Sequence, residues 1–305
     1  MAPSEHVDEA AGLDELITEA RGAQADYDSS STRELVELMN AEDARVPAAV
    51  AAAGEALAEA IDAIVERLSG GGRLVYVGAG SSGLIAALDA AECEATFSTE
   101  PGQVVALVVG EGLASVEREL AEDDGEAGAR AAESLGVSAA DAVVGVSASG
   151  RTPYVLGALE AAAATGALTV ALVSVPDSEL ARLAEHELAV VVGPEFVAGS
   201  TRLKAGTAQK LVLNTISTVA MIRLGKTYGD LMVDVRASNR KLVARARRIV
   251  RLATGVSDDE AEQALEAADG SAKVAVVALL AGVDADAARE RLERSGGHIG
   301  SALGR

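Results

Sequence analysis

The chain has 305 residues, a formal net charge of -21 at pH 7 and a hydrophobic content of 49%. This length allows one large or two modest domains, whose cores must rest on Ala, Val and Leu because Trp is absent and only 2% of residues are aromatic. The negative charge argues against nucleic acid or anionic membrane as a partner. With a single cysteine, Cys93, and three scattered histidines, we expect neither a disulfide framework nor a metal site.

The first thirty residues are polar and acidic, and they lack the basic and apolar segments of a secretory signal. We therefore expect a cytoplasmic protein whose first dozen residues are disordered. Ser31 and Glu34 have the spacing of a capping box, which predicts a helix that begins there. A longer helix is expected over residues 47–68, where apolar side chains recur every three or four positions.

Residues 73–92 have the pattern of a strand, a glycine- and serine-rich turn and a helix, in the sequence RLVYVGAGSSGLIAALDAAE. The β-favouring run at residues 74–77 leads into Gly78 and Gly80, which allow a sharp turn and a close approach of backbone to ligand. Backbone N–H groups at the start of the next helix then favour a phosphate. We interpret this turn as an anion-binding cradle.

The same turn also has the G-x-G-x-x-G spacing of a dinucleotide site, completed by Gly83. A dinucleotide fold wants an acidic residue roughly 20 positions further on, at the end of the second strand. Position 98 is instead Ser, and the next apolar run begins only after it. Ser81 and Ser82 place two hydroxyl groups in the turn, which favours a monophosphate that needs side-chain donors.

Further apolar runs of strand length alternate with helical segments, at residues 104–109, 142–146, 168–173 and 188–192. This alternation predicts a doubly wound α/β fold with a parallel sheet flanked by helices. Ligands of such sheets bind beyond the carboxyl ends of the strands. Small hydroxyl residues follow three of the expected strands, in the loops GSSG (80–83), SASGRT (147–152) and GST (199–201).

After the last of these loops the sequence predicts a long helix over residues 202–224 and a basic helix over 240–252, whose charged face we interpret as a solvated or inter-subunit surface. Ser257 and Glu260 form a second capping box, and three short helices should follow it. The expected domains are an N-terminal arm with a short helix (1–45), a sheet domain (46–255) and a small helical domain (256–305).

Longer motifs resemble one protein family. The loops at 80–83 and 147–152 are similar to the phosphosugar-binding loops of the sugar isomerase (SIS) fold. GPEFVAGSTRLKAGTAQK, at 193–210, resembles a signature shared by N-acetylmuramic acid 6-phosphate etherases and the glucokinase regulatory protein. Four other segments resemble the etherases alone: LDAAEC, AEDD, ASGRTPYV and GKTYGDLMVDV. The likeness extends from about Thr18 to the end of the chain.

The resemblance implies hydrolytic cleavage of the lactyl ether of N-acetylmuramic acid 6-phosphate, which gives N-acetylglucosamine 6-phosphate and D-lactate without a cofactor. Family enzymes eliminate lactate from carbon 3 after loss of the carbon 2 proton, and then add water to the unsaturated sugar. An ether is a poor leaving group unless it is protonated, so this chemistry needs two acid–base groups and an anchor for the phosphate.

Glu92 in DAAEC and Glu122 in AEDD match the catalytic positions of the family. Without the resemblance, both would be interpreted as exposed helix carboxylates. We expect Glu122, in an acid-rich segment, to take the carbon 2 proton, and Glu92, in an alanine-rich one, to protonate the departing oxygen, because an apolar setting favours the protonated acid. The sugar phosphate is assigned to side chains that could otherwise form turns, caps or a structural ion pair: Ser81, Ser82, Ser147, Ser149, Thr152, Arg202 and Lys204.

The chain departs from the usual family pattern at a few positions close to these motifs. Leu84 stands where the family usually has Arg, Ala86 and Leu120 stand in place of Gly, and Glu94 and Ala95 replace two prolines. The absence of a cation at position 84, beside the cradle, could weaken substrate binding or alter specificity.

Two alternatives share the phosphate loops. One is a sugar-phosphate sensor that resembles the glucokinase regulatory protein, but that protein has two SIS domains and 305 residues fit one. The other is an aldose–ketose isomerase of the same fold, which leaves the etherase-like motifs unexplained.

The position of Glu92 bears on the oligomeric state. If residues 82–92 form one helix, Glu92 lies about 15 Å from the cradle, too far for a carbon of the same small sugar. Either the helix ends early or Glu92 serves a neighbouring subunit. We therefore expect a homodimer that acts on a phosphorylated amino sugar, with no nucleic-acid or membrane partner.

Overall fold

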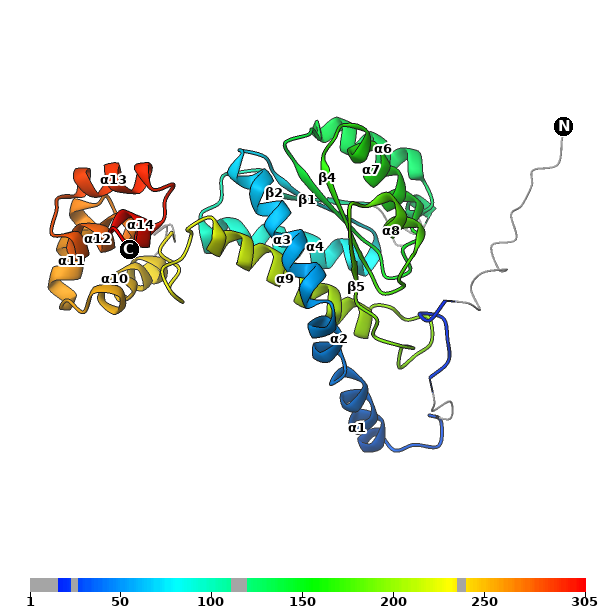
Figure 1. Cartoon of the computed structure of the whole chain (residues 1–305). Helices are drawn as coiled ribbons and strands as arrows, with labels where there is room; N and C mark the ends of the chain where they lie inside the picture. Colours follow the sequence, from blue (N-terminus) through cyan, green and yellow to red (C-terminus); the bar gives the residue numbers. More distant parts are fainter. Residues whose placement is uncertain (1–15, 23–26, 111–119, 235–239) are drawn as a thin grey trace. The chain divides into compact units, whose positions relative to one another are not determined.

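The computed structural model describes residues 16–22, 27–110, 120–234 and 240–305, and the expected disorder of the first dozen residues lies outside them. The chain forms two compact units. The first comprises residues 1–89 and 105–215, and the second comprises residues 90–104 and 216–305. Figure 1 shows the sheet of the first unit and the helices of the second.

The sheet has five strands in the order β2-β1-β3-β4-β5. Their bounds are β1 Leu74–Gly78, β2 Val104–Val108, β3 Ala142–Val146, β4 Leu168–Val173 and β5 His186–Ala189. The pairs β1–β3, β3–β4 and β4–β5 are parallel, which confirms the predicted α/β fold. The last strand was predicted at 188–192 and instead ends at Ala189, since beyond it the chain keeps one backbone bond to β4, from Val190 N to Val173 O.

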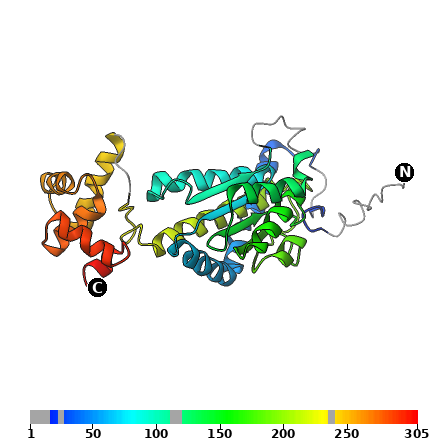
Figure 2. The ribbon, with the colours of Figure 1, turned by 90° about the horizontal axis from the view of Figure 1, so that it is seen from above.

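Helices cover both faces of the sheet (Figures 1 and 2). On one face lie α3 Gly54–Ser69, α4 Gly80–Phe97 and α9 Lys204–Arg223; on the other lie α6 Gly125–Leu135, α7 Pro153–Ala164 and α8 Glu179–Leu183. The residues of β1, β3 and β4 are all buried, as expected for central strands of a covered parallel sheet. Alanine and valine make up most of the core between β1, β3 and α7.

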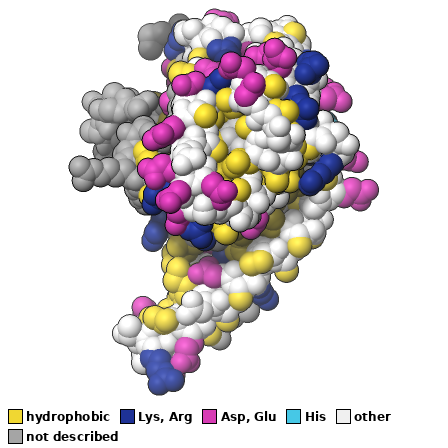
Figure 3. Space-filling view, turned by 90° about the vertical axis from the view of Figure 1, so that its left-hand side faces the viewer, with side chains coloured by type: hydrophobic (Ala, Val, Ile, Leu, Met, Phe, Trp, Pro, Cys, Tyr) yellow, Lys and Arg dark blue, Asp and Glu magenta, His cyan; other side chains and the backbone are white. Residues whose placement is uncertain are grey.

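The N-terminal arm begins with α1 Thr32–Asp43, and its predicted capping box is confirmed: Ser31 Oγ accepts from Glu34 N, and Glu34 Oε2 accepts from Ser31 N. No residue of α1 is buried, and hydrophobic side chains lie along its surface at the bottom of Figure 3. The helix predicted over 47–68 is wrong in one respect, because it is broken at Ala53 into α2 Val46–Ala52 and α3. The break precedes Gly54, a weak helix former.

The second unit contains α10 Arg240–Thr254, α11 Asp258–Ala267, α12 Ala272–Ala281, α13 Ala285–Arg294 and the short α14 Ile299–Ala302. The capping box of Ser257 and Glu260 is confirmed, and the last fifty residues hold four helices where three were predicted. Ile249 and Val250 of α10 share one core with the helices that follow. We therefore propose that the helical domain includes α10 and does not begin at residue 256.

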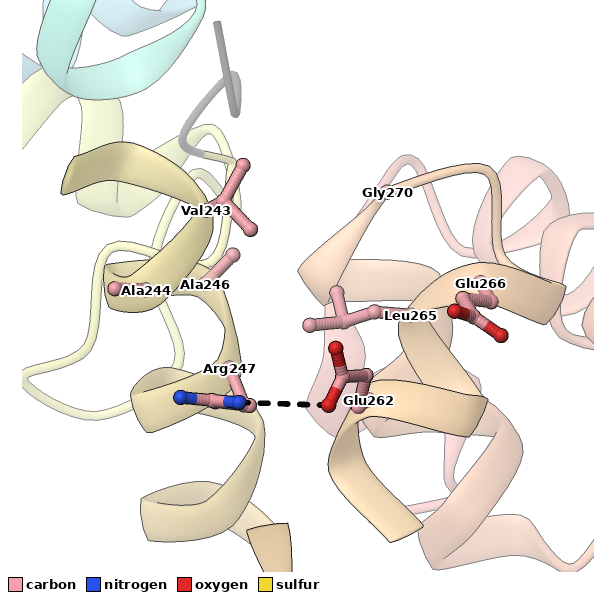
Figure 4. A pocket seen from close by; sticks show the side chains of 8 residues that line it. All are labelled: Val243, Ala244, Ala246, Arg247, Glu262, Leu265, Glu266 and Gly270. Atoms are coloured by element: carbon pink, nitrogen blue, oxygen red, sulfur yellow. Dashed lines mark hydrogen bonds and ion pairs between the residues drawn. The ribbon is translucent and has the colours of Figure 1, made fainter. Parts of the chain in front are cut away.

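The basic face of α10 is partly paired with α11. Arg247 contacts Glu262 at 3.4 Å and Arg251 contacts Asp258 at 3.1 Å; Figure 4 shows the first of these ion pairs. This face is therefore in part an internal contact of the helical unit. Among the described residues, no helix combines the length and the apolar character needed to span a membrane.

Helices α6 and α7 approach each other through glycines. A Cβ atom at Gly128 would lie 1.9 Å from Tyr154 O, and one at Gly157 would lie 2.0 Å from Gly125 O. The two backbones therefore touch directly. Helix α6 follows the segment that carries Glu122, and α7 follows the loop at 147–152, so this contact sets the distance between them.

We expect Gly157→Ala to lower the free energy of unfolding by about 1–3 kcal/mol, because the added methyl group meets backbone that cannot yield. In an open helix the same change would instead stabilise by at most about 1 kcal/mol. Gly54→Ala is the control, since no atom lies within 4 Å of its Cβ position. Urea unfolding followed by circular dichroism measures both; equal stability of the two variants contradicts the close-contact explanation.

Candidate active site

The candidate site lies where the chain reverses its direction of travel through the sheet. From β1 the chain passes to β2 on one side, and then returns to β3 on the other side. Such a switch point leaves a crevice beyond the carboxyl ends of the two central strands. Gly78 and Val146 are register partners, so the turns that follow β1 and β3 start at the same level.

A cavity of about 240 Å³ occupies this crevice. The turn after β1, the loop after β3, the loop before α9 and two carboxylate side chains all line it. The lining residues are Glu19, Ala79, Gly80, Ser81, Ser82, Glu122, Val146, Ser147, Ala148, Ser149, Thr152, Gly199 and Thr201. The structure thus brings together the three hydroxyl loops and one of the two predicted catalytic glutamates.

Gly80 is the point at which the cradle and Glu122 meet. Its φ of 51° is in the left-handed region, and a Cβ atom there would lie 3.1 Å from Glu122 Oε1. A side chain at position 80 would thus strain the backbone and crowd the carboxylate. The glycine motif serves the turn and also admits Glu122 to the cavity.

The cavity lies at the beginnings of two helices. Each helix dipole places partial positive charge there. At the start of α7, Pro153 has no N–H group, and Val155 N and Leu156 N donate to Thr152 O. Ser81 and Ser82 lie in the first turn of α4. This arrangement attracts an anion without a cationic side chain, and among the described residues that line the cavity there is no Lys or Arg.

The loop after β3 is held by its own hydroxyl groups. Ser147 Oγ lies 2.8 Å from Thr152 Oγ1 and accepts a hydrogen bond from Gly150 N at 3.0 Å. Ser149 Oγ accepts from Arg151 N at a longer 3.3 Å. These serines therefore shape the turn and also line the cavity.

The two cations predicted to bind substrate lie elsewhere. Arg202 is exposed and does not line the cavity. Lys204 is fully buried, and its Nζ contacts Glu42 Oε2 at 2.6 Å. A structural ion pair was the alternative role that the sequence allowed for Lys204. The hydrogen bond from Lys204 lowers the pKa of Glu42 below its ordinary value of 4.5.

Glu195 anchors the start of α9, and the sequence analysis did not single it out. Its carboxylate accepts hydrogen bonds from the backbone N–H groups of Lys204 and Ala205, both at 2.9 Å. A carboxylate at a helix N-terminus satisfies unpaired donors and complements the dipole. Since the loop at 199–201 directly precedes α9, Glu195 fixes the part of that loop that enters the cavity.

Glu92 does not line the cavity. It is exposed on α4, which continues without interruption from Gly80 to Phe97. The helix does not end early, so Glu92 lies about 15 Å along its axis from Ser82. The replacement of two prolines by Glu94 and Ala95 explains the continuity, because proline inside a helix removes a backbone donor and clashes with the preceding turn.

Glu19 is a second carboxylate in the cavity that the sequence analysis missed. A Cβ atom at Gly199 would lie 2.7 Å from Glu19 Oε2, so the two residues meet across a long stretch of sequence. The polar N-terminal segment gives no local signal of this contact. Within the described residues, no group of three or more His, Cys, Asp or Glu side chains is placed to hold a metal ion.

A larger hollow of about 540 Å³ lies in the helical unit between α10 and α11 (Figure 4). Val243 and Leu265 give it an apolar lining, and Arg247 and Glu262 pair at its edge. The guanidinium group of Arg247 is already paired with the carboxylate of Glu262. This hollow therefore suits a phosphorylated sugar less well than the cavity of the sheet unit does.

Known protein families and curated proteins match this chain over most of its length. Residues 56–163 match the model of the glucokinase regulatory protein N-terminal SIS domain, and residues 124–218 match the SIS domain. The N-acetylmuramic acid 6-phosphate etherase of Streptomyces avermitilis is 56% identical over 98% of this chain and 97% of its own length. The N-acetylmuramic acid 6-phosphate etherase of Rubrobacter xylanophilus is 58% identical over 96% of this chain and 97% of its own length.

The chain belongs to the N-acetylmuramic acid 6-phosphate etherase family. Among solved structures, a phosphoheptose isomerase from Francisella tularensis matches with a TM-score of 0.53 and 20% identity, over 63% of this chain and all of that one. This likeness concerns the fold, and it confirms the SIS-type sheet. The etherase names belong to relatives that match almost the full length of the chain, so the regulatory-protein alternative is not favoured.

We expect Glu42→Gln to destabilise the protein by on the order of 3 kcal/mol, because it leaves the buried Lys204 ammonium without a carboxylate. Adding Lys204→Met to the same chain should restore most of the loss. Glu37→Gln is the control on the same helix, since its partner Arg33 is exposed and such pairs contribute about 1 kcal/mol or less. Urea unfolding at pH 7 measures all three variants.

The same pair should give a pH dependence. Because the pKa of Glu42 is lowered in the folded state, its stabilisation is present above pH 4.5 and is lost as the pH falls through the lowered pKa. Glu42→Gln should therefore flatten the acid limb of stability against pH. A Lys204→Met variant that stays fully stable and loses only substrate affinity contradicts this structural role.

Proposed function

We propose that this protein cleaves the D-lactyl ether of N-acetylmuramic acid 6-phosphate, giving N-acetylglucosamine 6-phosphate and D-lactate. Membership of the etherase family supports this proposal, and one structural observation carries it. Serine loops and two helix N-termini meet at the switch point of the sheet, with the carboxylate of Glu122 beside them. The cavity thus offers an anion site next to an acid–base group.

The phosphate is bound by the first turn of α4 and by the loop after β3. Ser81, Ser82 and Ser149 supply hydroxyl donors, and backbone N–H groups at the start of α4 supply the rest. Ser147 and Thr152 hold the loop in shape through their mutual hydrogen bond. Arg202 and Lys204 have no direct part, because neither lines the cavity.

With the phosphate anchored, the open-chain form of the sugar extends past Glu122, and its carbon 1 aldehyde makes the carbon 2 hydrogen acidic. The Glu122 carboxylate takes the carbon 2 proton, and the bond from carbon 3 to the lactyl oxygen breaks. The electron pair leaves with that oxygen, which receives a proton from Glu92. Water then adds to carbon 3 and gives a proton to Glu92, while Glu122 returns its proton to carbon 2. In the net reaction, water cleaves the ether and gives N-acetylglucosamine 6-phosphate and D-lactate. This reaction needs no cofactor.

Glu92 reaches the sugar from a second copy of the chain. Within one chain the unbroken helix α4 keeps Glu92 about 15 Å from Ser82, whereas a proton donor must lie within hydrogen-bond reach. We therefore propose a homodimer whose two sites each use both subunits. We propose that the reaction takes place in the cytoplasm, because a charged sugar phosphate does not cross membranes freely.

The proposed function predicts that purified protein releases lactate from N-acetylmuramic acid 6-phosphate, and that Ser149→Ala lowers kcat/KM at least about tenfold. The lost hydrogen bond is to a charged group and contributes about 1.5–3 kcal/mol. Ser138→Ala is the control, since its Oγ contacts Asp141 at the opposite end of β3. Equal activity on the unphosphorylated sugar would overturn the phosphate assignment.

The division of labour predicts different isotope exchange for two variants in deuterated water. Glu92→Gln should still exchange the carbon 2 hydrogen of N-acetylglucosamine 6-phosphate while releasing no lactate from the ether, because only the proton donor is missing. Glu122→Gln should lose both. Nuclear magnetic resonance of the product measures the exchange. The opposite pattern reverses the two roles, and full lactate release by both variants shows that the pair is misidentified.

A further inference from the structure

The N-terminal segment 16–22 packs against the loop that precedes α9. Gly199 N donates a hydrogen bond to Thr18 O at 3.1 Å. Leu16 and Thr18 are 5% and 2% exposed, so burial fixes the segment at two of its residues. Glu19 N closes a turn within the segment by donating to Leu16 O at 3.0 Å. The backbone of Glu19 is therefore held in place just before the residue's side chain leaves it.

The loop that receives this segment is itself anchored. Glu195 accepts hydrogen bonds from two N–H groups at the start of α9, and a Cβ atom at Gly22 would lie 3.8 Å from Glu195 O. Next to this contact the rings of Tyr27 and Phe196 stack, with centroids 4.4 Å apart and an angle of 11° between their planes. The segment, the loop and α9 thus form one connected support for Glu19.

This support places the carboxylate of Glu19 in the cavity. A Cβ atom at Gly199 would lie 2.7 Å from Glu19 Oε2, so the carboxylate lies directly beside that glycine, and both residues line the cavity. Small-molecule pockets usually have volumes of about 300–1,000 Å³. Because this cavity measures about 240 Å³, a sugar phosphate bound in it has little space between opposite walls. Such a ligand contacts Glu19 as well as Glu122.

The reaction needs one proton-handling group besides the two already assigned. The elimination starts from the open-chain aldehyde, whereas a sugar with a free carbon 1 hydroxyl exists mainly as a ring. Ring opening removes the proton of that hydroxyl and supplies a proton to the ring oxygen. Glu122 and Glu92 are assigned to carbon 2 and to the lactyl oxygen. Among the described residues that line the cavity, Glu19 is the one carboxylate besides Glu122, and none of them is His, Lys or Cys.

We propose that Glu19 is the catalytic residue that opens the sugar ring, an inference that rests on the proposed function. The Glu19 carboxylate takes the proton of the carbon 1 hydroxyl. The bond from carbon 1 to the ring oxygen breaks, its electron pair leaves with the ring oxygen, and the carbon 1 oxygen becomes the aldehyde oxygen. Glu19 then gives the same proton to the ring oxygen. The carboxylate is regenerated, so the step needs no other reactant.

Geometry and charge both favour this role. The two oxygens that exchange the proton are bonded to the same carbon, so one fixed carboxylate serves both without moving. Glu122 lies at Gly80 and Glu19 lies at Gly199, so the two acids act from different walls of the cavity. A negative charge beside a bound phosphate opposes binding of that anion. Proton transfer therefore explains a carboxylate at this position better than phosphate binding does.

Anomer exchange tests ring opening separately from ether cleavage. The two anomers of N-acetylglucosamine 6-phosphate interconvert only when the ring opens and closes, and no bond to carbon 2 or carbon 3 changes. In two-dimensional exchange nuclear magnetic resonance, the parent protein should accelerate this interconversion. Glu19→Gln should lose about a hundredfold of the acceleration, the lower end of what general acid–base catalysis contributes. Its lactate release should fall to the rate at which the ring opens in water.

Two other variants serve as controls in the same experiment. Glu122→Gln should keep the anomer exchange while it loses lactate release, because ring opening leaves the carbon 2 proton in place. Asp28→Asn should keep both activities, since Asp28 is an exposed carboxylate on the same N-terminal arm and does not line the cavity. Circular dichroism of Glu19→Gln should match that of the parent protein.

Three results overturn the proposal. If the parent protein does not accelerate anomer exchange, no residue of the site opens the ring. If Glu19→Gln keeps the exchange and loses lactate release, Glu19 acts on the lactyl oxygen. If Glu19→Gln raises KM and leaves both kcat and the exchange unchanged, Glu19 only binds a hydroxyl group of the sugar.

The ring-opening role and the proposed function can fail separately. If the parent protein releases lactate and Glu19→Gln releases it equally fast, the ring-opening role is wrong and the etherase function stands. If the parent protein releases no lactate, the proposed function is wrong. Anomer exchange by the parent protein and by Glu19→Gln then still decides whether Glu19 opens the ring of a phosphorylated amino sugar.

Discussion

The beginnings of α4 and α7 meet at the reversal of strand order, and the rest of the site depends on that meeting. Each helix follows one of two neighbouring parallel strands, so the positive ends of both helix dipoles lie at one crevice. The proposed donors are backbone N–H groups and serine hydroxyl groups, and their positions are set by the sheet. A protein with a net charge of -21 can in this way attract an anion, because local dipoles act within a few ångströms while distant charges are screened over about 10 Å.

Two charged side chains at the start of α9, those of Lys204 and Glu195, form structural contacts. Lys204 is buried against Glu42, and Glu195 satisfies the backbone N–H groups at the start of α9. These contacts hold the loop at 199–201 in place, while the cavity itself keeps carboxylates and hydroxyls. A phosphate bound by dipoles and neutral donors would lie beside the carboxylate of Glu122 in this cavity.

Helix α4 performs two tasks along one length. Its first turn belongs to the cradle, its inner side is fixed to β1 and α9 through Asp89, and its outer side carries leucines in solvent. The helix is unbroken from Gly80 to Phe97, so Glu92 lies about 15 Å along its axis from Ser82.

Much of this protein was determined by local sequence. Alternating apolar runs predicted the sheet, Ser31 and Ser257 marked two helix starts, and three hydroxyl loops predicted an anion site, because strand length, capping and turn chemistry are properties of neighbouring residues. The tertiary structure alone decided which distant residues meet. Glu19 and Glu122 enter the cavity and Lys204 turns away to Glu42, since such contacts depend on strand order and on the glycine-mediated approach of α6 to α7. The periodicity of the sequence encodes neither the strand order nor the approach of α6 to α7.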